Sequence, residues 1–222
     1  MRDWRITNTD FFQKFKEAIN NKYKTLHILI EDDTVYIRGT LFLDSADGRE
    51  LDHYSIEIQI PHNFPKGLPI VREIGGRLPK ITDRHFNPVD ETACLFLPDE
   101  RYKYYPEGST IVDFIEGPVR SFFYWQADYD LNKGKSSFGE RGHADKGIIE
   151  FYTEEIGISD KAVIIKLLDY LTKKKVKGHW NCYCGSGKQL RYCHFDKLKD
   201  LRKKISRDDA LKSLERIKST KM

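Results

Sequence analysis

A period of two in the apolar residues runs through residues 35–60 and limits the fold of this chain more than any other feature. Apolar residues or glycine occupy every second position of residues 35–43 and again of residues 54–60, and Asp47-Gly48 between them is typical of a tight hairpin turn. Residues 26–30 alternate in the same way, and a short apolar segment follows at residues 70–74. The pattern predicts a four-stranded antiparallel meander with one buried face.

Helical periodicity flanks the predicted sheet. Residues 11–23 place aromatic and aliphatic side chains at helical spacing, and Asp10 with Gln13 predicts a capping box at the start of this helix. A second helix is expected to begin at Ser109 or Thr110. Together with the meander, these helices predict an α+β fold.

The rest of the chain predicts further helices and two irregular segments. Pro118 is expected to kink the second helix. A third helix is expected to open at Ser159-Asp160, and residues 198–217 predict one broken helix or two short ones. Residues 75–106 contain four prolines and no clear periodicity, and residues 131–147 are polar and glycine-rich, so both segments are predicted to be loops.

The charge is moderate but unevenly distributed. The 222 residues include 38 Lys and Arg and 34 Asp and Glu, and this net charge of +4 does not by itself indicate a nucleic-acid partner. Basic residues gather at residues 173–177 and 197–204, where a solvated helix face is the simpler interpretation and an acidic partner or nucleic acid the alternative. The sequence has no apolar segment of membrane-spanning length and no signal-peptide pattern at its start, so we expect a cytoplasmic protein.

The four cysteines fall into two groups. Cys94 stands alone, whereas the other three lie within residues 182–193. A disulfide framework would spread the cysteines along the chain, so this pattern favours a reducing compartment, a metal site and one separate thiol.

The clustered cysteines have the spacing of a metal site. Cys182 and Cys184 are followed after eight residues by Cys193-His194, which supplies three thiolates and one imidazole, a closed tetrahedral set for structural zinc. His179 is a competing ligand, and three unliganded cysteines in a glycine-rich loop are the alternative. The segment resembles the SEC-C zinc motif, named for the C-terminus of a bacterial translocation motor. This resemblance implies a small module that serves as a docking surface.

The order helix, meander, proline-rich loop, cysteine and helix resembles the ubiquitin-conjugating (UBC) family over roughly residues 1–130. Short motifs at matching places strengthen the resemblance. They are Ile60-Pro61-His62-Asn63-Phe64-Pro65 for the family's Tyr-Pro-x-x-Pro-Pro turn, His85-Phe86-Asn87 for His-Pro-Asn, Ala93-Cys94-Leu95 for Ile-Cys-Leu, and Pro106, Thr110 and Ile111 for Pro-x-x-Thr-Ile.

The resemblance implies a role for each residue of this loop. Cys94 would carry an acyl group as a thioester, because a thiolate is both a good nucleophile and a good leaving group. Asn87 would donate to the oxyanion that forms when a lysine attacks, or would pin the loop. His85 is expected to be structural. Without the resemblance, a buried inert thiol would be the simpler interpretation of Cys94.

The chain departs from the family pattern at two positions. Phe86 replaces the middle proline of the tripeptide, and Phe96 stands where the family often has an acidic residue. Asp99 and Glu100 are the candidates to take its place and to orient or deprotonate an attacking lysine.

A second candidate segment follows the second helix. Gly139-Glu140-Arg141-Gly142-His143 resembles a Gly-Glu-Arg-x-His stretch of some bacterial members of the family. The resemblance implies a polar cluster beside the thioester with His143 as a catalytic candidate. A loop held by a salt bridge is the equally favoured alternative.

These features divide the chain into a UBC-like conjugating domain (residues 1–155), a helical linker (156–178) and a SEC-C-like zinc module with C-terminal helices (179–222). The resemblance implies a short bacterial conjugating enzyme of anti-phage (CBASS-type) systems, which joins the C-terminal glycine of a cGAS-like nucleotidyltransferase or a ubiquitin-like protein to acceptor lysines. Two other functions stay open: a non-catalytic UBC-fold binding module, and a nucleic-acid or protein adaptor that acts through the zinc module.

Overall fold

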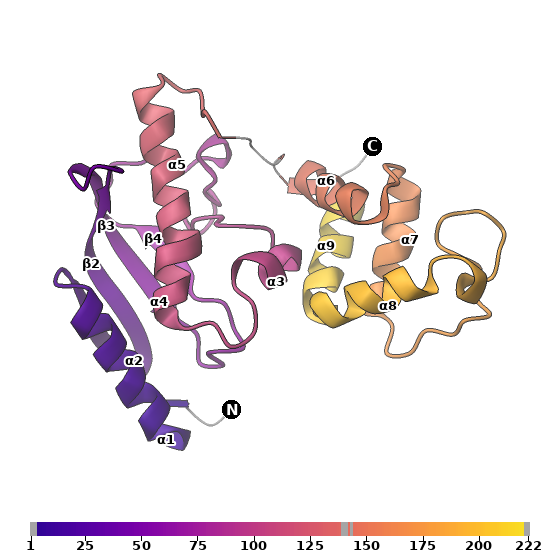
Figure 1. The fold of residues 1–222 in the computed structure, drawn as a ribbon, viewed down its shortest axis with the longest axis horizontal. Helices are drawn as coiled ribbons and strands as arrows, with labels where there is room; N and C mark the ends of the chain where they lie inside the picture. The colour runs from indigo at the N-terminus through magenta and orange to yellow at the C-terminus, as the bar shows by residue number, and fades with distance from the viewer. Residues whose placement is uncertain (1–3, 139–141, 143, 220–222) are drawn as a thin grey trace. The chain divides into compact units, whose positions relative to one another are not determined.

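The computed structural model describes residues 4–138, 142 and 144–219, and the chain divides into two compact units (Figure 1). The N-terminal unit comprises Met1–Leu95 and Tyr105–Gly139, and the C-terminal unit comprises Phe96–Tyr104 and Glu140–Met222. The chain therefore passes from the first unit to the second directly after Leu95, one residue beyond Cys94.

The N-terminal unit is built on the predicted antiparallel meander. The strands β1 (Leu26–Glu31), β2 (Thr34–Asp44), β3 (Glu50–Ile60) and β4 (Ile70–Glu73) form one sheet in the order β1-β2-β3-β4. The fold class is α+β, as predicted.

Two glycines let the meander form. The predicted Asp47-Gly48 turn joins β2 to β3, and Gly48 has a φ of +79° there. Gly39 has a φ of +145°, and a Cβ at this position would lie 1.8 Å from the carbonyl oxygen of Thr25. Since no side chain fits there, the glycine in the alternating pattern marks a close approach between β2 and the residue before β1.

The first long helix begins earlier than predicted. The short helix α1 (Trp4–Thr7) leads into α2 (Thr9–Lys22), whose N-cap is Asn8, with its Oδ1 accepting from the amide of Phe11 at 3.1 Å. The predicted capping box of Asp10 and Gln13 is therefore wrong. Asp10 lies in the first turn, where its negative charge interacts favourably with the positive end of the helix dipole.

The second predicted helix forms in three parts. Thr110 and Asp113 make a reciprocal capping box at the start of α4 (Ile111–Phe114). The π-helical turn η3 (Ile115–Val119) follows, and α5 (Arg120–Leu131) completes the helix. Pro118 lies inside η3. A proline has no amide donor for the regular helical hydrogen bonds, so the helix is irregular at this turn.

The hydrophobic core of this unit lies between the inner face of the sheet and α5. Ile37, Ile56 and Ile58 are fully buried on that face, and the ring of Tyr54 lies 4.8 Å from that of Phe123 on α5. In Figure 1, α5 runs across the sheet.

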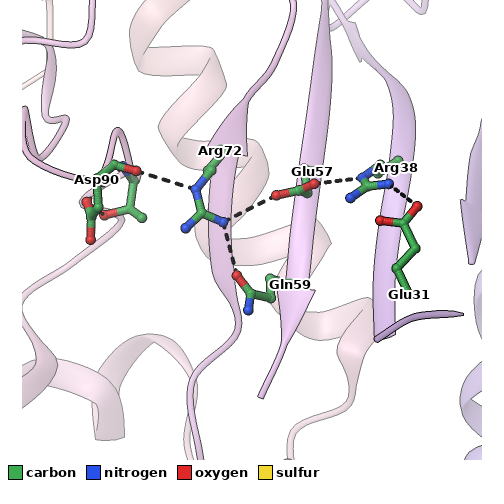
Figure 2. Close-up of polar contacts among 7 residues, drawn as sticks. Glu31, Arg38, Glu57, Gln59, Arg72 and Asp90 are labelled. Atoms are coloured by element: carbon green, nitrogen blue, oxygen red, sulfur yellow. Dashed lines mark hydrogen bonds and ion pairs between the residues drawn. The ribbon is translucent and has the colours of Figure 1, made fainter. Parts of the chain in front are cut away.

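The outer face of the sheet carries a ladder of alternating charges (Figure 2). Arg38 on β2 donates to Glu31 and to Glu57, each at 2.6 Å, and Arg72 on β4 donates to Glu57 at 3.2 Å and to Gln59 at 3.1 Å. The network links all four strands. Exposed ion pairs contribute little individually, so its main effect is to hold the long side chains in place.

The predicted loop at residues 75–106 contains short helical turns. These are η1 (Thr82–Arg84), η2 (Pro98–Glu100) and α3 (Arg101–Tyr104). The absence of a periodic pattern predicted a segment without long elements, but it did not reveal these turns, which are too short to show a period.

The C-terminal unit is helical. It contains α6 (Ala144–Ile156), α7 (Lys161–Thr172), η4 (Leu190–Tyr192), α8 (Phe195–Lys204) and α9 (Arg207–Ser219). Helix α7 begins after the predicted start at Ser159-Asp160. Its N-cap is Asp160, whose Oδ1 accepts from the amide of Ala162 at 2.7 Å. The two short helices expected after the cysteines are α8 and α9. Within the described residues, no helix combines the length and apolar character of a membrane span.

Helix α6 was not predicted, and it changes the division of the chain. Ile148, Phe151 and Tyr152 are buried in the same core as Leu167 and Leu168 of α7. Residues 144–155 therefore belong with the C-terminal helices, whereas the sequence placed them at the end of the conjugating domain. The glycines and polar residues before position 147 hid the start of this helix.

A buried carboxyl group attaches η2 to the C-terminal helices. Asp99 is 1% exposed, accepts from Ser213 of α9 at 2.6 Å, and also accepts from the hydroxyl of Tyr152 on α6. Burial raises the pKa of the Asp99 carboxyl, and the hydrogen bonds donated by Ser213 and Tyr152 offset only part of this rise.

Substitution of Asp99 by Asn is expected to change the pH dependence of stability. Since its pKa is raised in the folded state, the stability linked to Asp99 is fully present below its unfolded pKa of about 3.9 and is lost as pH rises through the raised value. The Asp99→Asn variant should therefore gain stability relative to the parent between pH 4 and pH 7, as measured by denaturant unfolding.

The control is Asp113→Asn. The amide of Thr110 holds the pKa of Asp113 below its usual value, so its contribution is present at pH 7 and is lost as pH falls. This variant should show the opposite trend. A pH-independent difference for Asp99→Asn would contradict the assignment.

Candidate thiol site and metal centre

Cys94 lies at the end of a small antiparallel hairpin in the N-terminal unit. Phe86 and Ala93 form an isolated β-bridge, and the amide of Cys94 donates to the carbonyl of His85 at 2.7 Å. The thiol is exposed. The backbone thus brings His85, Asn87 and Cys94 into one hairpin, and the exposed thiol does not fit a buried inert cysteine.

Asn87 shapes the turn of this hairpin. Its side-chain Oδ1 accepts from the amide of Val89 at 3.3 Å, its own amide donates to the carbonyl of Thr92 at 2.9 Å, and its carbonyl accepts from Glu91 at 2.8 Å. The side-chain oxygen therefore pins the loop, one of the two roles expected for Asn87. Its Nδ2 group is the part that can donate to a developing oxyanion.

Phe86, the departure from the family tripeptide, is an anchor in the core. It is 1% exposed, its ring meets that of Phe122 edge-on at 5.3 Å, and the Nζ of Lys80 lies 4.5 Å from its centroid. A proline would bury much less apolar surface at this position. The hairpin is therefore held down by an aromatic side chain between His85 and Asn87.

Arg84 ties the same segment to α5. Its Nε donates to Oε1 of Gln126 at 2.7 Å, its Nη1 lies 2.6 Å from Asp130, and Gln126 donates back to the carbonyl of Arg84 at 2.8 Å. Sequence reasoning missed this set of hydrogen bonds, which we call the Arg84 lock. The signal was a pair of polar residues, Gln126 and Asp130, four positions apart on a helix rich in aromatic residues.

The sheet supports the hairpin from the side of β4. The amide of Ala93 donates to the carbonyl of Val71 at 2.8 Å. Arg72, the end of the charged ladder, donates from Nε to the carbonyl of Asp90 at 3.4 Å (Figure 2). The carboxyl of Asp90 in turn accepts from the amide and hydroxyl of Thr92.

His85 has a structural place in the loop. Its backbone is left-handed, with a φ of +53°, at the end of η1, and its ring meets that of Trp125 edge-on at 4.7 Å. This conformation turns the chain into the hairpin.

The acidic residues after Cys94 do not face solvent. Asp99 and Glu100 are 1% and 2% exposed, and Asp99 is bonded to Tyr152 and Ser213. The suggestion that they orient an attacking lysine is therefore corrected, because burial removes them from a solvent-borne amine. Of the second candidate segment, Glu140, Arg141 and His143 lie outside the described residues.

The C-terminal unit brings the predicted metal ligands together. The donor atoms of Cys182, Cys184, Cys193 and His194 all lie within 4.8 Å of one another. The Nδ1 of His194 is 3.3 Å from Sγ of Cys182 and 3.1 Å from Sγ of Cys193, and the Sγ atoms of Cys184 and Cys193 are 3.6 Å apart. Neighbouring donors of a tetrahedral site are about 3.5–3.8 Å apart, so the group can hold a metal ion.

The backbone of residues 181–194 folds the donors toward one point. Asn181 bridges to Gln189, and Gly185 and Gly187 have φ values of +77° and +74° in the loop between them. These left-handed positions favour glycine and allow the tight turn. His194 is the N-cap residue of α8, and His179, the competing ligand, is not part of the group.

The environment makes the thiols of the centre unequal. Burial raises the pKa of the Cys182 thiol to about 11. Burial also acts to raise the pKa of the Cys184 thiol, but its hydrogen bonds with Ser186, Cys182 and Cys193 together outweigh burial and lower this pKa to about 6. A bound cation favours the thiolate form, so metal binding at this group is expected to release protons.

No model of a known protein family matches the chain, and no curated protein or solved structure matches it either. The resemblance to the UBC family and to the SEC-C motif therefore stays a prediction. What stands independently of it is the geometry of two groups: an exposed thiol on an anchored hairpin, and a four-donor cluster in the C-terminal unit.

Loss of one ligand is expected to empty the metal centre. Protein purified without chelator should contain one metal ion per chain by elemental analysis, and Cys193→Ser should contain almost none. Since structural metal sites in small peptides contribute about 10–16 kcal/mol of binding free energy at pH 7, residues 179–194 should then become sensitive to protease.

The matched control is Cys94→Ser, which removes the remaining cysteine of the chain and should keep the metal. A parent protein that lacks metal while its C-terminal segment resists protease would contradict the assignment.

Proposed function

We propose that this chain is a UBC-like conjugating enzyme that carries an acyl group as a thioester on Cys94. The supporting observation is the exposed thiol at the end of a hairpin. The amide of Cys94 donates to the carbonyl of His85, and Asn87 lies at the turn of the same hairpin. An exposed thiol on an immobilised backbone can reach a partner and can hold a bound acyl group in one orientation.

The proposed reaction has two steps. In the first, Sγ of Cys94 attacks the activated C-terminal carbonyl of the donor, the activating group leaves, and the thiol proton passes to solvent. In the second, the amine of an acceptor lysine attacks the thioester carbonyl, the bond to Sγ breaks, and an isopeptide bond replaces it. The lysine loses its proton to solvent and Cys94 leaves as a thiolate.

The proposed donor follows from the resemblance of the motifs. It is the C-terminal glycine of a ubiquitin-like protein or of a cGAS-like nucleotidyltransferase, in a cytoplasmic bacterial anti-phage system, and the acceptors are lysine-bearing proteins. In this setting the chain would act as the short conjugating component.

We infer that the metal of the C-terminal unit is zinc and that its role is structural. Three sulfur donors and one imidazole suit Zn²⁺, and four protein ligands leave no position for a substrate or water. The loop between Asn181 and Gln189 is too short to bury a core of its own, so the ion would replace that core.

Replacement of Cys94 is expected to trap or abolish the intermediate. The chain should be expressed together with the genes that adjoin its own, and its intact mass measured. Parent protein should carry a thioester adduct that hydroxylamine removes, Cys94→Ser a more stable oxyester, and Cys94→Lys an adduct resistant to both hydroxylamine and thiols. Normal conjugation by Cys94→Ala would refute the proposal. Stable binding of an intact donor without a covalent adduct would instead support a non-catalytic binding module.

The two roles of Asn87 can be separated by two substitutions. Asn87→Asp keeps an oxygen to accept from the amide of Val89 but removes the Nδ2 donor, whereas Asn87→Ala removes both. If the donor stabilises the oxyanion, both variants should load Cys94 and should discharge it to free lysine about a hundredfold to a thousandfold more slowly.

Thermal melts distinguish the loop-pinning role. Pinning alone would make Asn87→Ala less stable and impair loading as much as discharge, while Asn87→Asp would behave like the parent. Unchanged single-turnover discharge in both variants would remove Asn87 from the proposed catalytic group.

A further inference from the structure

The charge of the chain is strongly segregated along the sequence. Residues 161–222 contain 18 Lys and Arg against 6 Asp and Glu, whereas residues 1–160 contain 20 against 28. The net charges are therefore +12 and −8. A small total charge thus conceals a basic C-terminal segment, and unpaired charge at this density attracts polyanions.

Three hydrogen bonds join the basic residues of this segment into one strip. The Nε of Arg207 donates to the carbonyl of Thr172 at 2.9 Å, and Nη2 of Arg202 donates to the carbonyl of Lys174 at 3.2 Å. At the other end, the amide of Arg191 donates to the carbonyl of Gly178 at 2.9 Å. The segment 173–178, between α7 and η4, thereby links the α8–α9 junction to the loop of the metal centre. We call this surface, formed by residues 173–178, 188–192 and 202–207, the basic strip.

The exposed cations of the basic strip outnumber their acidic partners. Lys173 pairs with Asp169 at 2.9 Å, and Lys204 pairs with Asp200 at 2.7 Å. Among the described residues no carboxylate pairs with three further exposed lysines, which are Lys174, Lys175 and Lys177.

The strip is hollowed at one end and carries an aromatic ring at the other. A cavity of about 310 Å³ is lined by Arg202, Lys203, Lys204 and Arg207 together with Leu171, Ile205 and Ser206, with no acidic side chain among them. The ring of Tyr192 is 71% exposed, and the guanidinium of Arg191 lies 4.7 Å from its centroid.

We propose that the basic strip binds single-stranded nucleic acid. Cations spaced along a continuous backbone track fit a chain of phosphates, and an exposed tyrosine beside an arginine offers a surface on which a base can stack. An acidic protein would use the cations but not the exposed ring, so the combination favours nucleic acid. This inference concerns the C-terminal unit alone and does not depend on the chemistry of Cys94.

The test is equilibrium binding of a fluorescein-labelled 20-nucleotide single-stranded RNA of mixed sequence to the full-length, metal-loaded protein. Affinity should fall steeply with salt. The slope of log K against log salt is negative, and each lost phosphate contact reduces its magnitude by about 0.7. The triple variant Lys174→Gln, Lys175→Gln, Lys177→Gln should therefore reduce the magnitude of the slope by about 2 and weaken binding in 0.05 M salt by about a hundredfold or more.

The matched control changes the same charge elsewhere, with Lys14→Gln, Lys24→Gln and Lys135→Gln, which are exposed lysines of the N-terminal unit. It should bind like the parent. Tyr192→Ala should weaken RNA binding by about fivefold to a hundredfold with little change in the salt slope. Metal content and thermal melts of each variant establish that the C-terminal unit is intact.

Three outcomes would overturn the proposal. They are no binding in 0.05 M salt, equal losses in the strip and control variants, and competition by polyglutamate as effective as by unlabelled RNA with no effect of Tyr192→Ala. The last result would assign the strip to an acidic protein.

Discussion

The position of Cys94 depends on a buried arginine. Arg84 places its guanidinium against Gln126 and Asp130 of α5, and Gln126 returns a hydrogen bond to the carbonyl of Arg84 itself. Asp130 is 44% exposed, so solvent screens part of the ion pair. The reciprocal bonds with Gln126 are buried, and removal of one partner would leave an unsatisfied polar group in the core. Because His85, Phe86 and Asn87 follow directly, the geometry of the candidate site depends on this lock.

The residues that follow Cys94 are held by hydrogen bonds and ion pairs to the helices of the C-terminal unit. Asp99 is five residues further on and belongs to the C-terminal unit, where Tyr152 and Ser213 bind its carboxyl. Tyr102 of the same segment donates to Glu155 at 2.7 Å, and Lys197 also binds Glu155. The residues after Cys94 are thus part of a helical core that includes the metal centre. Local unfolding of that core would release residues 96–104, so the stability of the metal-bearing unit bears on the segment beside the thiol.

The parts of the fold that follow a strong period could be predicted. The four strands, the start of α7 and the pair α8 and α9 were predicted, because alternation and helical spacing persist over many residues there. The four-donor cluster was also predicted, since its spacing of cysteines and histidine is set by coordination geometry. Asn8 was missed as the N-cap because Asp10 offers the same chemistry two residues later. Arg84 and Asp99 could not be assigned, since a buried ionic group acquires its meaning from partners that are 42 to 114 residues away.

The two units treat charge in opposite ways. On the sheet, Arg38 and Arg72 alternate with Glu31 and Glu57, so each cation has an acidic neighbour and the face is nearly neutral. In residues 161–222 of the C-terminal unit the cations exceed the acids threefold, and their mutual repulsion opposes folding. With Zn²⁺ on three thiolates and one imidazole, the metal centre would carry a net charge of −1 where three neutral thiols carry none. Metal binding would therefore reduce the repulsion within the unit while it closes the loop. A bound polyanion would relieve the rest, so metal and nucleic acid would each stabilise the same folded state.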